Sequence, residues 1–568
     1  MKPALFVTAA IAAAVAVFTG FSLPPPRLAL AGHDGDTVAG VLHVHTNRSD
    51  GQSSPEEVAA AAARVGLKFV VFTDHGDGTR PPDPPTYRAG VLCLDAIEIS
   101  TSRGHYLALD MPSAPYPLGG DARDVIEDVR RLGGFGVAAH PDSPREELRW
   151  RDWSLPFDGV EIVNLDSSWR LHLAESGWRP TVRLLKAFLA YPLRARETIA
   201  GLVAVTPDTI REFDALTETR RVVALAGADA HARLALGNAD PGAERFSLPF
   251  PGYETVFQTL AIHVRPERPL SRDAAADGRL VMQALRAGRL YTVVSGLASP
   301  SFFEFTAENG GGVGREGEVM APGGPITLRV RSNAPPGFIT TILQGGRVLI
   351  SREGQEVVVA TPGESGVFRA EVRTTGRSDA SRWIISNPIF VWTRSSADIP
   401  AVPAPRARTL LFDGRDASRW RVETDPTSRA ELDLADLVEG RTLRLRYGLS
   451  GGAPAGQFAA LAVDTAGGVA PHERLMLTVR ADRPMRMSVQ ARVAVSPTEN
   501  ERWQRSVYVD EVSRELAVVF DDMTPVGATR TPRPPPASVH SIVFVVELTN
   551  AKPGSSGRIW IREASLER

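Results

Sequence analysis

The sequence predicts an α/β domain followed by two β-sandwich domains. Between residues 38 and 300, short apolar runs alternate with helix-like segments, as in repeated β/α units with a parallel sheet. After residue 300 the pattern changes to short alternating strands separated by glycine and proline turns, which is typical of β-sandwiches. The chain has 568 residues, too many for one ordinary core, and its length suggests about three or four units.

The first β/α units show the pattern most clearly. A strand is predicted over Val41 to His45, and Ser54, Pro55 and Glu57 then supply an N-cap, a proline at the first helical position and a capping-box glutamate. The next strand, Lys68 to Phe72, is a continuous apolar run of the kind that helices bury on both faces. The same alternation continues in later segments of this domain, although residues 168 to 218 are less regular, with helices expected over 181 to 189 and 207 to 216.

Two β-domains are expected after the α/β domain. Residues 301–398 predict an Ig-like β-sandwich and residues 409–568 a jelly-roll β-sandwich, joined by a semi-rigid linker at 399–408. The strands that carry this prediction are Ile326 to Arg331, Thr340 to Leu343, Val357 to Ala360, Phe368 to Val372, Thr442 to Tyr447, Leu475 to Arg480, Met487 to Ala494 and Ser541 to Glu547.

The first 31 residues predict export. An almost wholly apolar run from Ala4 to Phe21 follows Lys2, and Ala29-Leu30-Ala31 offers a small-x-small cleavage site of a signal peptide. Because the run is close to the ~20 residues that span a bilayer, an uncleaved membrane anchor is the alternative. Either reading places the body of the protein in the periplasm or outside the cell, where its single cysteine, Cys93, leaves it without an internal disulfide.

Composition excludes one class of partner. The chain is 43% hydrophobic and 23% charged, as globular proteins are, and its formal net charge of −2 gives no field that would attract a polyanion. No nucleic-acid partner is therefore inferred from charge.

Metal-ligand residue types gather at the ends of predicted strands. In a barrel of parallel strands, side chains at the carboxyl ends converge on one rim, where active sites form. His43 and His45 are two residues apart on one strand and so face the same side, and Asp229 and His231 repeat this spacing. The full candidate set is His43, His45, Asp50, His75, Glu98, His105, His140, Asp229 and His231.

This mixture of residues points to metal chemistry. Neutral imidazoles and carboxylates are good ligands for Zn, Mn or Fe, and six imidazoles with three carboxylates are too many for one ion. We expect two or three ions per chain, bridged by a carboxylate, which would lower the pKa of bound water. Candidate substrate contacts are Arg48, Arg80, Arg103 and His172, although for each arginine an ordinary solvated loop position is the alternative.

The motifs His-Val-His, Ser-Asp-Gly, Thr-Asp-His, Ile-Glu-Ile-Ser, Gly-His, Ala-His-Pro and Gly-Ala-Asp-Ala-His occur in that order. In this combination the chain resembles the polymerase-and-histidinol-phosphatase (PHP) superfamily over residues 38–300. The resemblance implies a distorted (β/α)7 PHP barrel, a trinuclear site and phosphoester hydrolysis by metal-bound hydroxide. It also implies three ligand groups, namely His43, His45, Glu98 and Asp229, then Asp50, His75 and His231, then Glu98, His105 and His140.

Three functions remain open from the sequence. The leading one is a metal-dependent phosphoesterase with Glu98 and Asp229 as the candidate catalytic residues, acting on a small phosphoester. The second is hydrolysis of an amide or carbamate at the same site. The third is a surface binding protein with a vestigial barrel, in which the C-terminal domain binds a carbohydrate or a cell-surface ligand.

Overall fold

The protein is described from a computed structural model that covers residues 20, 23–32, 35–235, 247–363, 365–375, 381–392, 408–438, 440–452, 456–465, 467–496 and 499–568. It divides into two compact units. Unit 1 takes residues up to 76, 81–112 and 126–396, and unit 2 takes residues 77–80, 113–125 and 397–568. Most of the expected signal or anchor segment 1–31 and all but the last residue of the expected linker 399–408 lie outside the described residues.

The core of unit 1 is a ring of strands. β2 (Val38–Val44) is paired in parallel with β3 (Phe69–Phe72) on one side and with β10 (Val223–Ala230) on the other. Further parallel pairs join β3 to β5 (Val91–Asp95), β8 (Phe135–Ala138) to β9 (Gly159–Asn164), and β9 to β10. These strands are almost wholly buried, as expected for parallel strands covered on both faces.

The expectation of a (β/α)7 barrel is wrong. β6 (Ile97–Thr101) and β7 (Gly104–Leu109) form an antiparallel hairpin, and β7 is also antiparallel to β8. The two residues between β6 and β7, Ser102 and Arg103, leave room only for a hairpin, because a parallel pair needs a crossover of a dozen or more residues. β13 (Ala261–Val264) is likewise antiparallel to β2 and to β14 (Leu290–Val293).

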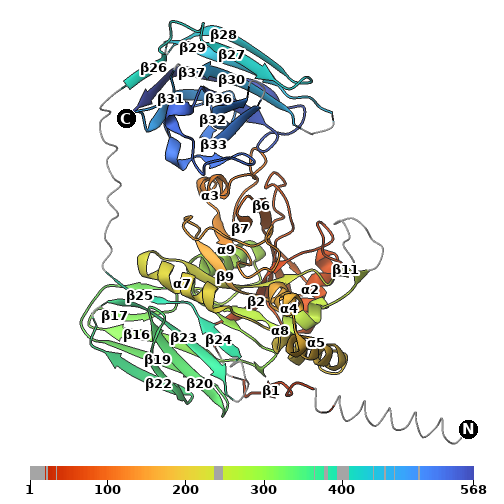
Figure 1. Ribbon diagram of the computed structural model, residues 1–568. Helices are drawn as coiled ribbons and strands as arrows, with labels where there is room; N and C mark the ends of the chain where they lie inside the picture. Colours follow the sequence, from red (N-terminus) through yellow and green to blue (C-terminus); the bar gives the residue numbers. More distant parts are fainter. Residues whose placement is uncertain are drawn as a thin grey trace, which may run out of the picture. The chain divides into compact units, whose positions relative to one another are not determined.

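The sheet also continues beyond residue 300, and more of the described residues lie in strands than in helices. β14 pairs with β24 (Arg382–Ser386), which continues the sheet into β23 (Gly366–Thr374), β20 (Phe338–Gln344), β21 (Arg347–Glu353) and β25 (Ile389–Val391). A separate four-stranded sheet has the order β17 (Gly312–Arg315), β16 (Phe303–Asn309), β19 (Ile326–Ser332) and β22 (Glu356–Thr361). Figure 1 shows these green strands as a β-region adjoining the strand ring of unit 1. The four strands predicted here are confirmed as β19, β20, β22 and β23.

Helices of unit 1 flank the ring. α2 (Pro55–Arg64) begins with the predicted capping box, in which Ser54 accepts a hydrogen bond from the Glu57 N–H and the Glu57 side chain accepts one from the Ser54 N–H. Both helices expected in the irregular region are confirmed, as α5 (Trp178–Ala190) and α7 (Pro207–Thr219). The other helices of unit 1 are α4 (Leu165–Ala174), α6 (Ala195–Ala200), α8 (Tyr253–Thr259) and α9 (Ala274–Arg286), while α3 (Ala122–Arg131) starts in the residues of unit 2 and ends in those of unit 1.

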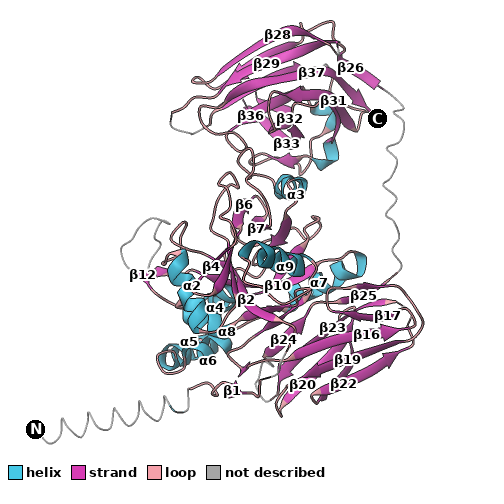
Figure 2. Ribbon diagram, turned by 180° about the vertical axis from the view of Figure 1, so that it is seen from behind, coloured by secondary structure: helices cyan, strands magenta, loops and turns pink. Residues whose placement is uncertain are grey.

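Unit 2 is built around a β-sandwich of two six-stranded sheets. One sheet has the order β28 (Arg429–Leu437), β29 (Gly440–Gly448), β37 (Ser556–Glu567), β31 (Arg474–Ala481) and β34 (Arg514–Val519), with β26 (Arg408–Phe412) also on β37. The other has the order β27 (Trp420–Thr424), β30 (Phe458–Asp464), β36 (Ser541–Glu547), β32 (Met485–Ser496), β33 (Glu499–Val509) and β35 (Thr524–Pro525). The four strands predicted in this region are present as β29, β31, β32 and β36. In Figure 2 these strands are magenta. Among the described residues of 408–568, helix is limited to the short turns η1 (Phe520–Asp522) and η2 (Pro536–Ser538).

Short elements complete the description. β1 (Leu28–Ala29) pairs in parallel with β15 (Ala298–Ser299), so the predicted cleavage site at 29–31 begins within a paired strand. Within the described residues, no helix is both long enough and apolar enough to span a membrane. The remaining short strands are β4 (Thr86–Arg88), β11 (Leu234–Ala235), β12 (Ser247–Leu248) and β18 (Val319–Met320).

Candidate metal centre

The structure brings all nine predicted ligand residues together. They lie at or just beyond the carboxyl ends of β2, β3, β8 and β10 and on the β6–β7 hairpin. Four groups each have donor atoms within 4.8 Å of one another. The groups are His45 with Asp50, His75 and His231; His43 with Glu98 and His140; His43 with His45 and Asp229; and His75 with Glu98 and His105.

Glu98 is at the centre of the cluster and is only 1% exposed. Its Oε1 lies 2.7 Å from His105 Nδ1 and 2.9 Å from His140 Nε2. Its Oε2 lies 3.1 Å from His43 Nε2 and 3.2 Å from His45 Nε2. One carboxylate therefore touches imidazoles from both sides, which is the arrangement expected of a bridging ligand.

One side of the cluster is open to solvent. The side chains of Asp50 and His75 are each 33% exposed and that of His231 is 20% exposed, whereas His43 and His45 are fully buried. Asp50 Oδ2 lies 3.3 Å from His231 Nε2 and 3.7 Å from His75 Nε2. A substrate would therefore approach from the side of these three residues.

The backbone leaves regular strand geometry at three of the ligands. His43, Asp229 and His140 have φ angles of 65°, 46° and 29°, in the left-handed region that non-glycine residues rarely adopt. The register of β2 against β3 shifts between Leu42 and Val44, so the strand pairing is irregular at His43. His43 and His45 therefore reach the same cluster without the regular strand geometry that the sequence predicted, and irregular backbone of this kind is common next to functional sites.

His45 carries two nitrogen atoms without a hydrogen-bond partner among the described residues. Its Nε2 lies 3.2 Å from Glu98 Oε2 and 3.5 Å from Asp229 Oδ1, and its Nδ1 lies 3.4 Å from Asp50 Oδ1. Nδ1 of the buried His140 also lacks a partner. Buried polar atoms normally have partners, so these donor atoms fit divalent cations placed between imidazole and carboxylate.

Glu161 is a functional residue that sequence reasoning missed. It is 1% exposed on β9, its Oε1 lies 2.6 Å from His43 Nδ1, and its Oε2 accepts hydrogen bonds from the His140 N–H and from Asn164 Nδ2. A carboxylate on the second nitrogen of a ligating histidine fixes its tautomer and orientation. The sequence feature that could have identified it is a single charged residue inside the otherwise uncharged, buried strand Gly159–Asn164.

Asp74 supports the loop that carries Asp50. Its Oδ1 accepts hydrogen bonds from the Thr46 N–H at 2.8 Å and from Ser49 Oγ at 2.6 Å, and its Oδ2 accepts one from Thr46 Oγ1 at 2.7 Å. Asp74 therefore ties the turn at residues 46–50 to the end of β3.

Burial and charge oppose each other inside the cluster. Burial lowers the pKa of His43, but the carboxylates of Glu161, Asp229 and Glu98 outweigh it and hold that pKa well above its usual range. Burial raises the pKa of Glu98, but His43 and its other histidine neighbours outweigh this and hold it well below its usual range. The carboxylates therefore favour positive charge at this site, whether it comes from protons or from bound cations.

The four candidate substrate contacts have other neighbours. Arg48 forms an ion pair with Asp83 and lies 3.5 Å from Asp95, and Arg103 lies 4.0 Å from Asp152. His172 Nδ1 is 2.9 Å from Arg183 Nη1 and 3.4 Å from Glu175 Oε1, which are not among the nine ligands. Arg80 is exposed on the 77–80 segment of unit 2. Their role in substrate binding stays a prediction.

Comparisons with known proteins assign no family. No family model matches the chain. An uncharacterized protein of Methanocaldococcus jannaschii is 29% identical over 137 residues, which cover 22% of this chain and 80% of that protein. A family 11 carbohydrate-binding module from Clostridium thermocellum, in complex with a mixed-linked tetrasaccharide, has a TM-score of 0.23 and 12% identity over 28% of this chain and 94% of the module. A family 30 carbohydrate-binding module has a TM-score of 0.22 and 12% identity over 28% and 99%. Likenesses at these TM-scores carry no argument about this chain.

Proposed function

We propose that the chain is a metal-dependent hydrolase whose nine-residue cluster holds two or three divalent ions, with Mn, Zn and Fe as the candidates. The observation that carries the proposal is Glu98, a buried carboxylate with five imidazole rings having a nitrogen within 3.4 Å of its oxygens. Such a concentration of donors is costly to bury unless cations compensate the carboxylates.

The chain's own residues would divide the work. Glu98 would bridge ions, Glu161 would hold the His43 ring in one orientation through the 2.6 Å contact, and Asp50 and His231 would face the incoming substrate. Bound ions would supply Lewis acidity and lower the pKa of a water at the site. Cys93 is excluded as a nucleophile, because it is buried on β5 and burial raises its pKa.

Phosphoester hydrolysis is the reaction that this cluster suits best. Several cations can neutralise several non-bridging oxygens of a phosphate at once, whereas a carbamate offers one carbonyl oxygen. Hydrolysis of an amide or carbamate at the same site is the second enzymatic candidate. The resemblance of the motifs to the PHP superfamily supports the phosphoesterase reading.

The candidate from another class is a surface binding protein, in which the sandwich of unit 2 takes a carbohydrate or a cell-surface ligand. Sugar recognition commonly uses an exposed aromatic platform. Trp420, Trp503 and Trp560 of this sandwich are all buried, so these rings supply none. We therefore rank this function below hydrolysis.

The deciding experiment combines elemental analysis with a substrate screen. Protein purified without chelator and supplied with Mn, Zn and Fe should contain two or three ions per chain, and Glu98→Gln should lose most of them. Glu146→Gln is the matched control, since the Glu146 side chain is 78% exposed and pairs only with Arg149 among the described residues. One ion or none in the wild type would overturn the cluster.

The reaction type is tested on the same preparations with nitrophenyl phosphate, a phosphodiester and a naphthyl carbamate. We expect turnover of a phosphoester that Asp229→Asn abolishes. If only the carbamate were hydrolysed, and Asp229→Asn abolished that activity, the phosphoesterase assignment would be wrong. The assignment of the metal site would be unaffected by that result. Metal without turnover of any of the three would favour the binding-protein candidate.

A further inference from the structure

A cavity of unit 1 lies at the opposite end of the strand ring from the metal centre. Its volume is about 710 Å³. Val38 at the start of β2, Lys68 directly before β3 and Gly90 directly before β5 line it, so it opens at the amino ends of the parallel strands. The nine ligand residues lie toward the carboxyl ends, so the two sites are separate.

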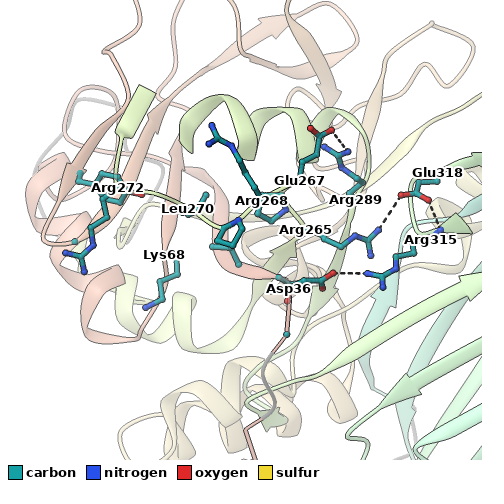
Figure 3. Close-up of a pocket in the computed structure, with 17 residues that line it drawn as sticks. Asp36, Lys68, Arg265, Glu267, Arg268, Leu270, Arg272, Arg289, Arg315 and Glu318 are labelled. Atoms are coloured by element: carbon teal, nitrogen blue, oxygen red, sulfur yellow. Dashed lines mark hydrogen bonds and ion pairs between the residues drawn. The ribbon is translucent and has the colours of Figure 1, made fainter. Parts of the chain in front are cut away.

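The lining of this cavity is cationic. It includes the six cations Lys68, Arg265, Arg268, Arg272, Arg289 and Arg315, against the three carboxylates Asp36, Glu267 and Glu318, which leaves a formal excess of three positive charges. Figure 3 shows that these side chains come from segments far apart in the sequence, between residues 36 and 318. This local excess contrasts with the net charge of −2 for the whole chain.

Part of this charge is already paired. Arg289 Nη1 donates to Glu267 Oε1 at 2.8 Å, and Arg315 Nη1 donates to Asp36 Oδ2 at 2.8 Å. For Lys68, Arg268 and Arg272, Figure 3 draws no ion pair to a carboxylate of the lining, and their side chains are exposed. These three cations are therefore available to a ligand in the cavity.

Arg265 adds a buried donor. It is 8% exposed, and its Nη1 donates to Glu316 Oε1 at 2.7 Å, but its Nη2 lies 4.0 Å from Glu318 and has no hydrogen-bond partner in the described part of the chain. A buried guanidinium N–H without an acceptor destabilises the fold, because nothing replaces the hydrogen bond that it makes to water in the unfolded chain. An oxyanion that reached this nitrogen would remove that cost.

We propose that this cavity binds a small molecule with at least two negative charges, carried on phosphate or carboxylate groups. Guanidinium groups recognise both oxyanions with two parallel hydrogen bonds, and Lys68 would add a point charge. The site is distinct from the metal centre and does not depend on the proposed hydrolase activity.

Calorimetric titration of the full chain with pyrophosphate and with citrate tests this proposal. We expect saturable binding of at least one probe that is unchanged in Glu98→Gln and at least tenfold weaker in the double variant Lys68→Gln/Arg268→Gln. The charge-matched control is Arg211→Gln/Arg415→Gln, because these arginine side chains are 75% and 88% exposed outside the cavity. Comparing the probes identifies the preferred oxyanion. Absence of binding, or binding lost in Glu98→Gln and kept in the cavity variant, would overturn the proposal.

A different observation concerns helix α5. Trp178, Val182, Leu185 and Phe188 follow helical spacing and are all exposed, Trp178 and Phe188 by 73% and 77%. Leu193, just after this helix, is also exposed. A contiguous exposed apolar stripe on the surface of a folded protein marks an interaction site.

The charges and the chain path near α5 indicate what covers this stripe. The helix carries Arg179, Arg183 and Lys186 and no acidic residue. The backbone just after the apolar run of residues 4–21 lies against the next helix, α6, because Arg194 donates to the Pro24 carbonyl and the Arg27 N–H donates to Glu197 Oε1. A basic helix with an exposed Trp, Leu and Phe stripe has the features of a helix that lies in a membrane interface.

We infer that α5 lies on an anionic lipid bilayer. The test uses Leu185→Cys in the full chain, labelled with an environment-sensitive dye, because the native Cys93 is buried. With vesicles of phosphatidylglycerol and phosphatidylcholine, the dye emission should shift to the blue, and Arg179→Glu/Lys186→Glu should reduce the shift. A label at Val313→Cys, a residue that is 62% exposed on β17, should not respond. The inference would be overturned if the dye at 185 showed no blue shift in vesicle-bound protein, or if the dyes at both positions shifted equally. A blue shift that appeared without vesicles as the protein concentration rose would also overturn it, in favour of self-association.

Discussion

Glu161 illustrates how a residue that is not a predicted ligand can control one at the candidate metal centre. It lies 118 positions from His43 in sequence, yet the two side chains form a buried 2.6 Å contact. Its other oxygen accepts the His140 N–H, so one carboxylate orients two of the nine ligand residues. Such outer contacts keep a ring nitrogen aimed at a metal and raise its basicity.

Replacing Glu161 by glutamine should weaken the metal centre without removing it. Glu161→Gln keeps the size of the side chain but removes the charge that stabilises the orientation of His43. We expect metal affinity or turnover to fall about 10- to 100-fold, measured by metal titration and by initial rates. Glu146→Gln should change neither quantity. Wild-type metal affinity and turnover in Glu161→Gln would show that the contact with His43 has no functional role.

Gly227 makes room for Glu161. A Cβ atom at this position on β10 would lie 1.9 Å from Glu161 Oε1, so the carboxylate would have to move. Gly227→Ala should therefore lower metal affinity in the same direction as Glu161→Gln, as metal titration would measure. Gly252→Ala is the matched control, since its Cβ would meet only the Pro249 carbonyl oxygen, at 3.9 Å. Unchanged metal affinity in Gly227→Ala would contradict this account.

At the scale of elements, a buried ion cluster joins strand β23 to helix α7. Glu371 on β23 is fully buried and contacts Arg369, Arg373 and Arg382, and Arg369 also donates to both oxygens of Asp214 on α7. Burial raises the pKa of Glu371, but the three arginines outweigh it and lower that pKa to about 2. The charged form of Glu371 therefore stabilises the packing of these two elements.

The pH dependence of stability should report this cluster. Because the pKa of Glu371 is lower in the folded chain than its model value of 4.5, its contribution is complete above pH 4.5 and is lost as the pH falls toward 2. The size of the shift corresponds to about 3 kcal/mol. Glu371→Gln should lower the free energy of unfolding of unit 1 by about 3–5 kcal/mol at pH 7, measured by denaturant titration, and the gap to wild type should narrow below pH 4.5. A gap independent of pH would contradict the ion-pair account.

The capping box of α2 is a local device that can be tested separately. Ser54→Ala removes the oxygen that accepts the Glu57 N–H and should lower the stability of unit 1 by about 1 kcal/mol in thermal unfolding. Ser54→Asp, which keeps an acceptor at the N-cap, should restore most of the loss. If aspartate were no better than alanine, the hydrogen bond would not be the source of stability.

For the whole molecule, metal binding and folding should be coupled. The ligand residues span positions 43 to 231, so ions held between them would cross-link strands that are distant in the sequence. Such ions bind the folded chain better than the unfolded chain and stabilise it by mass action. Chelator treatment should therefore lower the melting temperature of the wild type by several degrees, and Mn or Zn should restore it, as calorimetry would detect. The same treatment should have little effect on Glu98→Gln. Equal responses in both proteins would place the bound ions outside the cluster.

The sequence alone determined the identity of the nine clustered residues and the local elements that carry them. His75 and His140 each follow a buried apolar strand, and Ser54 and Glu57 start a helix. In each case, the residues that form the signal lie within a few positions of one another in the sequence. Hydrophobic periodicity, caps and turns act over that short range, which is why most predicted strands on both sides of residue 300 are present.

Only the tertiary structure decided how the strands pair and what surrounds the ligands. The hairpin of β6 and β7, and the continuation of the ring from β14 into β24, replace the expected barrel, because pairing partners are chosen by packing between segments far apart in the chain. Contacts such as that between Glu161 and His43, and the gathering of cations from residues 68 to 315 around one cavity, have no local signal. They arise when distant side chains are buried together, where an unpaired charge is costly and a matched one stabilises the fold.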